Sequence, residues 1–421
     1  MRAQARPARP TILVLLGAAA ALRVMVVIVA TAFGPADAIG DIIFHSQLLA
    51  DPVGHLRQPT ADLEQYAPYL GFAEWVTARP WIALGAGETT ALRMGSILWD
   101  LAGMAVLLVA VARAWPERLV LAGVLWAASP LLWPASALAA QDEPIAAALT
   151  AVALLLLVAG RPAGAVAVLT VGLFVAKVLL APIIVAVALT APPSSRARIV
   201  GTGVTTLLVC VLLTFAVGAR DGLSSQFSYR TDLISFSMTP WSTLVLHHAV
   251  DVDTALDVSV PLALVACIVV MVAWFGHRST GSAATTRLGA ALLFASFAML
   301  AVSNPEYLAI AAPLAVMAVV ATERRPRPWF VVAAAGLAWF VNLAYYALRT
   351  AYDATGSILP RTGFRGDLSG RVRLLDIVHQ AGLVLCWGAL VAVAWRWAHE
   401  ESPPSTSPSH VDDAAIAPVT T

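Results

Sequence analysis

The residues best suited to chemistry are a few charged side chains beside long apolar segments. Lys177 is the only lysine of the chain and lies within the apolar run 172–182. An ammonium group at membrane depth is costly and usually functional. A lysine near the membrane surface also extends its amine to water without any further role. Lys177 is therefore a candidate for binding an anion such as a phosphate, with this simpler placement as the alternative.

Asp41 and the adjacent pair Asp142 and Glu143 are the candidate acidic groups. Asp41 follows the outer end of the first apolar segment. Partial desolvation by apolar neighbours would make its carboxylate a stronger proton acceptor and a possible general base; a helix N-cap is the alternative. Gln141 precedes Asp142 and Glu143 where another apolar segment begins, so these residues either cap a helix or contact a substrate.

Further candidates combine amide, aromatic and arginine side chains. The turn Asn304-Pro305-Glu306-Tyr307 interrupts an apolar run, so its polar groups either face a cavity or form a helix corner. Tyr66 and Tyr69 belong either to an interfacial aromatic belt or to a sugar-stacking surface. Two long loops expected outside, 219–259 and 349–373, carry arginines although the positive-inside rule disfavours basic residues there. These arginines either bind an anion or are solvated loop charges. The candidates among them are Arg230, Arg361 and Arg365.

Composition places these residues in a membrane protein. Of the 421 residues, 59% are hydrophobic and 12% are charged, and the mean hydropathy is +0.80. The formal net charge of +1 gives no sign of a nucleic-acid partner. We predict an all-α polytopic protein with roughly 10–13 transmembrane helices. The apolar segments are 11–33, 89–112, 119–136, 143–159, 164–176, 178–190, 198–218, 260–276, 288–303, 306–321, 329–348 and 374–397, where 164–190 and 288–321 could each be one bent helix or two.

The charge pattern predicts the orientation. If the basic N-terminus lies inside, every short loop expected in the cytoplasm carries arginine, as the positive-inside rule requires. The candidate residues then all lie on the outer face. If each had an independent structural role, they would be scattered over both faces. We therefore expect one outward-facing site in a multi-pass protein of the plasma membrane, surrounded by membrane lipids.

The domain organisation is simple. Residues 1–10 form a basic cytoplasmic N-terminus, and the apolar run after them is long enough for an uncleaved anchor rather than a signal peptide. Residues 11–397 form one transmembrane domain, whose long first outer loop, 34–88, should contain short interfacial helices. The tail 398–421 is predicted to be disordered. We interpret Cys210, Cys267 and Cys386 as small buried apolar residues, and we expect no metal and no cofactor.

The order of these motifs resembles the GT-C superfamily of membrane glycosyltransferases, in particular the bacterial polyprenyl-phosphate-mannose-dependent mannosyltransferases, which are related to the GPI-anchor mannosyltransferases. The matching elements are Asp41, Tyr66-Ala67-Pro68-Tyr69, Gln141-Asp142-Glu143, a Gly-Arg turn at 160–164 followed by Lys177 and Pro182, and Glu306-Tyr307. One departure is that Asp37 and Asp41 are four residues apart, where an Asp-x-Asp pair is usual.

The resemblance implies a GT-C-like bundle that moves a hexose, with mannose as the expected sugar, from a polyprenyl-phosphate carrier to a glycolipid or glycan acceptor, with inversion. Asp41 would deprotonate the acceptor hydroxyl, and Lys177 with Arg230 or an arginine of 349–373 would neutralise the departing phosphate. Two other classes stay open: a secondary transporter or lipid flippase, and a ligase or polymerase of lipid-linked glycans.

Overall fold

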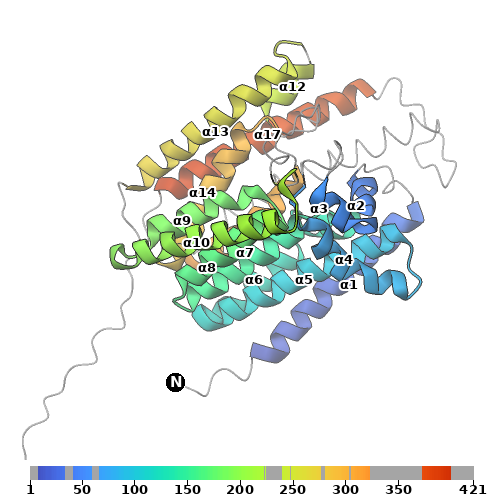
Figure 1. Ribbon diagram of the computed structural model, residues 1–421, viewed down its shortest axis with the longest axis horizontal. Helices are drawn as coiled ribbons and strands as arrows, with labels where there is room; N and C mark the ends of the chain where they lie inside the picture. The colour runs from blue at the N-terminus through green and yellow to red at the C-terminus, as the bar shows by residue number, and fades with distance from the viewer. Residues whose placement is uncertain are drawn as a thin grey trace, which may run out of the picture.

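In the computed structural model of the chain, every described element is a helix (Figure 1). The structure describes residues 8–33, 41–58, 66–221, 223, 239–246, 248–275, 280–302, 305–322 and 372–399, without the side chains of 32–33, 41–43, 243, 246, 305, 322, 372–380 and 383. No strand occurs within these ranges, which confirms the predicted all-α class. The expected helix at 329–348 and the tail from 400 lie outside them.

Five described helices are long and apolar enough to cross a membrane. They are α1 (Ala8–Phe33), α5 (Glu88–Ala114), α10 (Pro193–Ala216), α13 (Val252–Phe275) and α14 (Ser282–Met299). The helices α1, α10 and α13 bury few of their apolar residues inside the protein, which suits contact with lipid rather than water. The chain is a multi-pass membrane protein.

Shorter helices fill the interior of the bundle. They are α6 (Leu119–Ala127), α7 (Glu143–Val158), α8 (Pro162–Val175), α9 (Ala181–Thr190) and α15 (Leu308–Thr322). One apolar core joins them to α5, to α14 and to the last described helix, α17 (Val372–His399). Short connecting elements are η3 (Pro116–Arg118), η4 (Pro134–Leu138), η5 (Val178–Leu180), η7 (Pro305–Tyr307) and α12 (Pro240–Leu246).

Both ambiguous segments consist of two helices. In 164–190, α8 ends at Val175 and η5 begins at Val178, so the break includes Lys177. In 288–321, α14 ends at Met299 and η7 begins at Pro305; proline cannot donate the backbone hydrogen bond that a continuous helix would need. Each break puts polar residues at the end of short apolar helices.

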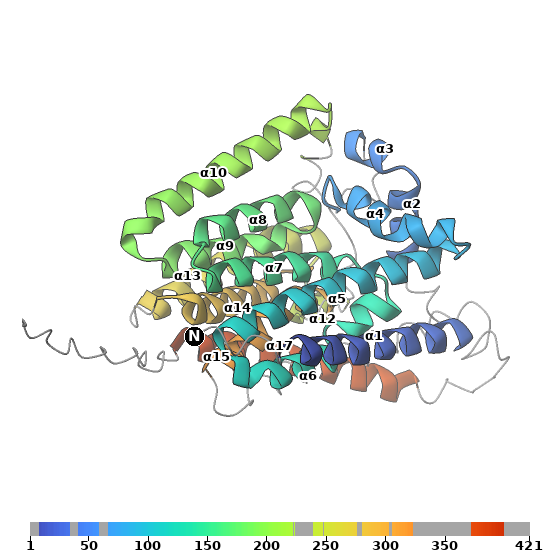
Figure 2. The ribbon, with the colours of Figure 1, turned by 90° about the horizontal axis from the view of Figure 1, so that it is seen from below.

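The loop 34–88 contains short helices, as predicted; those described are α2 (Asp41–Ala50), α3 (Pro52–Arg57) and α4 (Leu70–Ala83). They lie together beside the start of α5 (Figure 2). Asp51 caps α3, since the Gly54 N–H donates to Asp51 Oδ1 at 2.8 Å. Gly71 is where α4 approaches α2: a Cβ atom there would lie 3.0 Å from the Leu48 carbonyl oxygen.

A buried ion pair ties α1 to the bundle. Arg23 Nε donates to Asp100 Oδ2 at 3.0 Å, and both side chains are fully buried. Asp100 also accepts from Trp126 Nε1 at 2.8 Å and from Ser136 Oγ at 2.7 Å. Arg23 Nη1 donates to the Ala127 carbonyl oxygen at 2.7 Å. Because the carboxylate and the guanidinium are both well hydrogen-bonded, this network can remain buried and hold α1, α5 and α6 together.

The cysteines are placed as small apolar residues would be. Cys386 is buried in the core, and Cys210 and Cys267 are partly buried on α10 and α13. Cys267 Sγ lies 3.2 Å from Ser296 Oγ of α14. The thiols therefore take part in helix packing.

Candidate active site

Lys177 is the centre of a buried polar cluster at one end of the bundle. The Ala176 and Lys177 N–H groups both donate to the Gly172 carbonyl oxygen, at 2.9 and 3.2 Å, which closes α8. Lys177 itself is extended, with φ −145° and ψ 138°. Its Nζ lies 3.1 Å from Asp142 Oδ1 and 3.2 Å from Glu143 Oε1. The lysine side chain is 13% exposed and both carboxylates are fully buried.

The backbone before α7 places the two carboxylates. Ala140 has a φ of 54°, a left-handed conformation that costs energy for a residue other than glycine. Gln141 stabilises this turn through its backbone: its N–H donates to the Ala135 carbonyl oxygen at 2.9 Å, and its carbonyl oxygen accepts from Ser96 Oγ at 2.8 Å. Asp142 is the N-cap residue of α7 but its side chain makes no capping hydrogen bond. The Asp142 carboxylate is thus directed to Lys177 instead of capping the helix.

Two tyrosine rings flank the ammonium group. Lys177 Nζ lies 5.6 Å from the centroid of Tyr66 and 5.1 Å from that of Tyr307, within the range of cation–π attraction. Glu306, next to Tyr307 in η7, interacts electrostatically with Glu143. The structure therefore brings together residues from four distant motifs of the sequence.

Tyr69 has another position. Its hydroxyl pairs with Thr214 Oγ1 of α10 at 3.2 Å, and its N–H donates to the Phe174 carbonyl oxygen at 2.9 Å. Tyr69 thus fastens the first outer loop to α8 and α10. Among the contacts of the described residues, it makes none with Lys177, so the two tyrosines that the sequence treated as a pair have separate roles.

His45 and Glu74 belong to the cluster although the sequence gave no sign of them. His45 of α2 forms a buried ion pair with Glu74 of α4 through Nδ1 and Oε1. The His45 ring also packs against Tyr66, with centroids 5.2 Å apart and planes inclined by 58°. Burial raises the pKa of the Glu74 carboxyl, while the charge and hydrogen bond of His45 oppose this shift.

Of the other predicted site residues, only the backbone of Asp41 lies in the described part of the structure. Asp41 is the first residue of α2, one helical turn before His45, and its side chain lies outside the described part of the structure. The positions of Asn304, Arg230, Arg361 and Arg365 also lie outside it. Their proposed contacts with substrate stay predictions.

The cluster has buried acceptor atoms that no described donor fills. Oδ2 of Asp142, Oε2 of Glu143 and Oε2 of Glu74 accept no hydrogen bond from the described residues. Buried carboxylate oxygens are normally hydrogen-bonded, and these can only accept. The carboxylates of Asp142, Glu143 and Glu74 also outnumber the ammonium group of Lys177. The arrangement therefore suits a bound molecule that places a neutral, hydroxyl-rich group against the carboxylates. Any negatively charged group of that molecule would lie near Lys177.

Comparison with known proteins gives remote structural similarity only. No protein-family model matches the sequence, and no curated protein matches it. Among solved structures, the fold is similar to the crystal structure of ArnT from Cupriavidus metallidurans in the apo state. The TM-score is 0.41 and the sequence identity is 14%, over 79% of this chain and 67% of that chain. This similarity concerns the arrangement of helices and assigns no role to any residue.

Proposed function

We propose that the chain is a membrane glycosyltransferase that moves a sugar from a polyprenyl-phosphate carrier to a hydroxyl acceptor. The observation that carries the proposal is the buried group of Lys177, Asp142 and Glu143, where α7 begins and the chain breaks after α8. Carboxylate oxygens that only accept hydrogen bonds match the hydroxyl groups of a sugar, and Tyr66 and Tyr307 offer rings for its apolar face.

The donor would lie with its sugar on the carboxylates and its phosphate toward Lys177. Among the described residues, Lys177 is the one cation in contact with both Asp142 and Glu143, so it orders the sugar-binding groups and also adds positive charge beside the leaving group. Arg230, Arg361 and Arg365 are the proposed further partners of the phosphate. The sugar is a hexose, with mannose expected from the motif resemblance, and the acceptor is a glycolipid or glycan.

Asp41 is the proposed general base. It begins α2, the helix that contributes His45 to the cluster. The Asp41 carboxylate takes the proton of the acceptor hydroxyl while that oxygen forms a bond to the anomeric carbon. The bond from this carbon to the phosphate oxygen breaks, and its electron pair leaves with the polyprenyl phosphate. Attack from the face opposite the phosphate inverts the anomeric configuration.

The outer face of the plasma membrane is the proposed location of the site. Arginines gather at the opposite ends of the helices: Arg113 ends α5, Arg161 precedes α8, and Arg196 and Arg198 lie in the first turns of α10. The positive-inside rule assigns that end to the cytoplasm. The Lys177 cluster would then meet lipid-linked substrates on the outer side.

Membranes that contain the chain test this proposal directly. Incubation with radiolabelled polyprenyl-phosphate mannose should yield labelled glycolipid, and Asp41→Asn should lower transfer about 100-fold or more while expression and donor binding persist. Asp251→Asn, at the exposed start of α13, is the matched control and should keep full transfer. Near-normal transfer by Asp41→Asn would disprove the role of Asp41 as the general base. Failure to use any polyprenyl-phosphate hexose would disprove the function.

A transporter or lipid flippase is the second candidate, and one observation favours it. The buried ion pairs lie at breaks between short apolar helices, a placement that transporters use for their substrate sites. Proteoliposomes distinguish the two: a flippase would move a fluorescent polyprenyl-phosphate sugar across the bilayer without forming a new glycolipid.

A further inference from the structure

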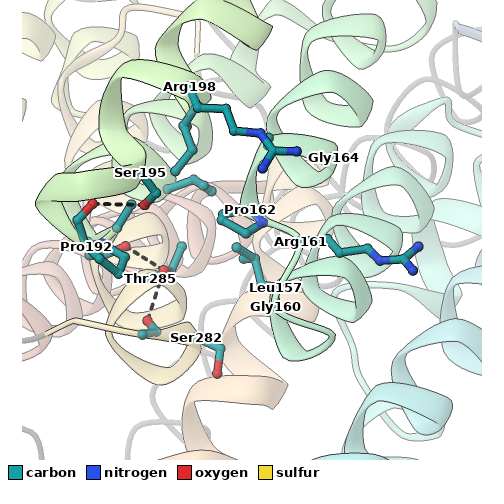
Figure 3. A pocket seen from close by; sticks show the side chains of 16 residues that line it. Leu157, Gly160, Arg161, Pro162, Gly164, Pro192, Ser195, Arg198, Ser282 and Thr285 are labelled. Atoms are coloured by element: carbon teal, nitrogen blue, oxygen red, sulfur yellow. Dashed lines mark hydrogen bonds between the residues drawn. The ribbon is translucent and has the colours of Figure 1, made fainter.

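A cavity lies at the opposite end of the bundle from Lys177. It has a volume of about 710 Å³ and lies where α7 ends, where α8, α10 and α14 begin, and where α9 ends (Figure 3). Arg161 and Arg198 are its charged lining residues, and no acidic residue lines it. Neither arginine forms an ion pair with the described residues. The cavity is therefore positively charged.

Three helix N-termini add to this positive charge. The helices α8, α10 and α14 all begin at the cavity, and their N-cap residues Arg161, Pro192 and Gly281 make no side-chain capping hydrogen bond. The first N–H groups of a helix have no partner within it and carry the positive end of the helix dipole. Pro162 and Pro193 begin α8 and α10 without an N–H group, so the free backbone donors of these two helices belong to the residues that follow the prolines.

The side chains show where an anion would fit. Figure 3 shows Arg198 of α10 extending toward Gly164 of α8, while Arg161 points away from the other labelled residues. Ser195, one turn before Arg198, donates to the Pro192 carbonyl oxygen at 2.9 Å. Thr285 is occupied by the Gly281 carbonyl oxygen at 3.0 Å and by Thr190. Ser195 and Thr285 thus both donate to backbone carbonyl oxygens, and the guanidinium of Arg198 is the main side-chain donor left among the lining residues.

Apolar surface adjoins the part of the cavity that Arg198 lines. Leu157, Val187 and Ile199 line the cavity. Beyond Arg198, the outer face of α10 exposes Val200, Val204, Leu207 and Leu208, and α10 lies at the edge of the bundle beside α8 (Figure 2). A ligand that fills the cavity thus meets positive charge at one end and an apolar helix face along the membrane.

We propose that this cavity binds an anionic phospholipid. Its phosphate lies against Arg198 and the first turn of α8, and its acyl chains run along α10. Because the positive-inside rule assigns this end to the cytoplasm, the lipid comes from the inner leaflet. The proposal does not depend on the glycosyltransferase activity, since the two sites lie at opposite ends of α7 and α8.

Native mass spectrometry of the purified full chain with added lipid tests the proposal. We expect phosphatidylglycerol to be retained in preference to phosphatidylcholine. One arginine near a lipid phosphate contributes about a fivefold change in binding, so Arg198→Ala should lower retention of phosphatidylglycerol by about fivefold. Arg198→Lys should keep most of it. Arg113→Ala, an exposed arginine in the last turn of α5 outside the cavity, should bind as the parent does.

Three results would overturn the lipid site. The first is equal retention of the two lipids. The second is unchanged binding by Arg198→Ala, which is readable because this exposed residue contributes little to folding. The third is displacement of phosphatidylglycerol by millimolar glycerol phosphate, which would mean that the cavity binds a free phosphate compound and needs no acyl chain.

Discussion

Lys177 Nζ lies 3.1 Å from Asp142 Oδ1, and its second carboxylate partner, Glu143, adjoins Asp142 in the chain. Two neighbouring carboxylates in a buried place repel each other, and one ammonium group compensates both. The contact also joins the start of α7 to the break after α8. The same lysine thus holds the local fold and shapes the proposed sugar site.

Lys177→Met should destabilise the protein strongly. The variant keeps a long side chain but leaves two buried carboxylates without their cation, which costs about 3–5 kcal/mol. Thermal unfolding in detergent should show a clear fall in the melting temperature. Lys177→Arg keeps the charge and should recover most of this loss. If Lys177→Met melts at the parent temperature, the ion pair does not stabilise the fold.

Glu74→Gln should change how stability depends on pH. The folded-state pKa of Glu74 is raised by burial, so its protonated form favours the folded protein below the unfolded pKa, and this contribution is lost as pH rises through the folded pKa. Glutamine imitates the protonated carboxyl at every pH. As pH rises above the unfolded pKa of a glutamate, the melting temperature of the variant should therefore improve relative to the parent. A difference that stays constant with pH would contradict this account.

Arg23 and Asp100 should behave as a coupled pair. Arg23→Met leaves the Asp100 carboxylate buried without its cation, at a cost of about 3–5 kcal/mol. The double variant Arg23→Met with Asp100→Asn removes both charges, so it should be more stable than Arg23→Met alone. Melting temperatures of the two single variants and the double variant give the coupling energy. Additive losses would show that the pair does not act as one unit.

Gly71→Val should separate α2 from α4. The added side chain meets the Leu48 carbonyl oxygen and Pro52. These are backbone and proline-ring atoms, which cannot rotate away. Overpacking of this kind costs about 1–3 kcal/mol. Because α2 carries His45 and α4 carries Glu74, transfer activity should fall more than expression does. Gly17→Ala in α1, where a Cβ atom meets nothing within 4 Å, is the control and should retain activity.

The sequence singled out Lys177, Asp142 and Glu143 as candidates on one face because charge is rare in apolar segments, but it did not predict that Lys177 pairs with the two carboxylates. A lone lysine and two adjacent carboxylates stand out there, and helix ends that share one face bring them together. Tyr66 and Tyr307 followed from their place at the same ends. Tyr69 could not be separated from Tyr66 by spacing alone, because only the packing against α10 decides where its hydroxyl points.

The pairs His45–Glu74 and Arg23–Asp100 could not be predicted. Each joins residues from different helices, and no periodicity relates positions that meet only through tertiary packing. His45 and Glu74 lie in the first outer loop, where polar residues are common and attract no notice. Arg23 and Asp100 each interrupt an apolar segment, but a single charge within a segment does not reveal which other helix holds its partner.

The Arg23–Asp100 pair also constrains how the protein enters the membrane. Arg23 leaves the ribosome 77 residues before Asp100, so α1 is made while its counter-charge does not yet exist. An unpaired arginine within the bilayer is costly, and α1 gains its full stability there only when α5 arrives. Insertion of α1 is therefore coupled to the synthesis of α5.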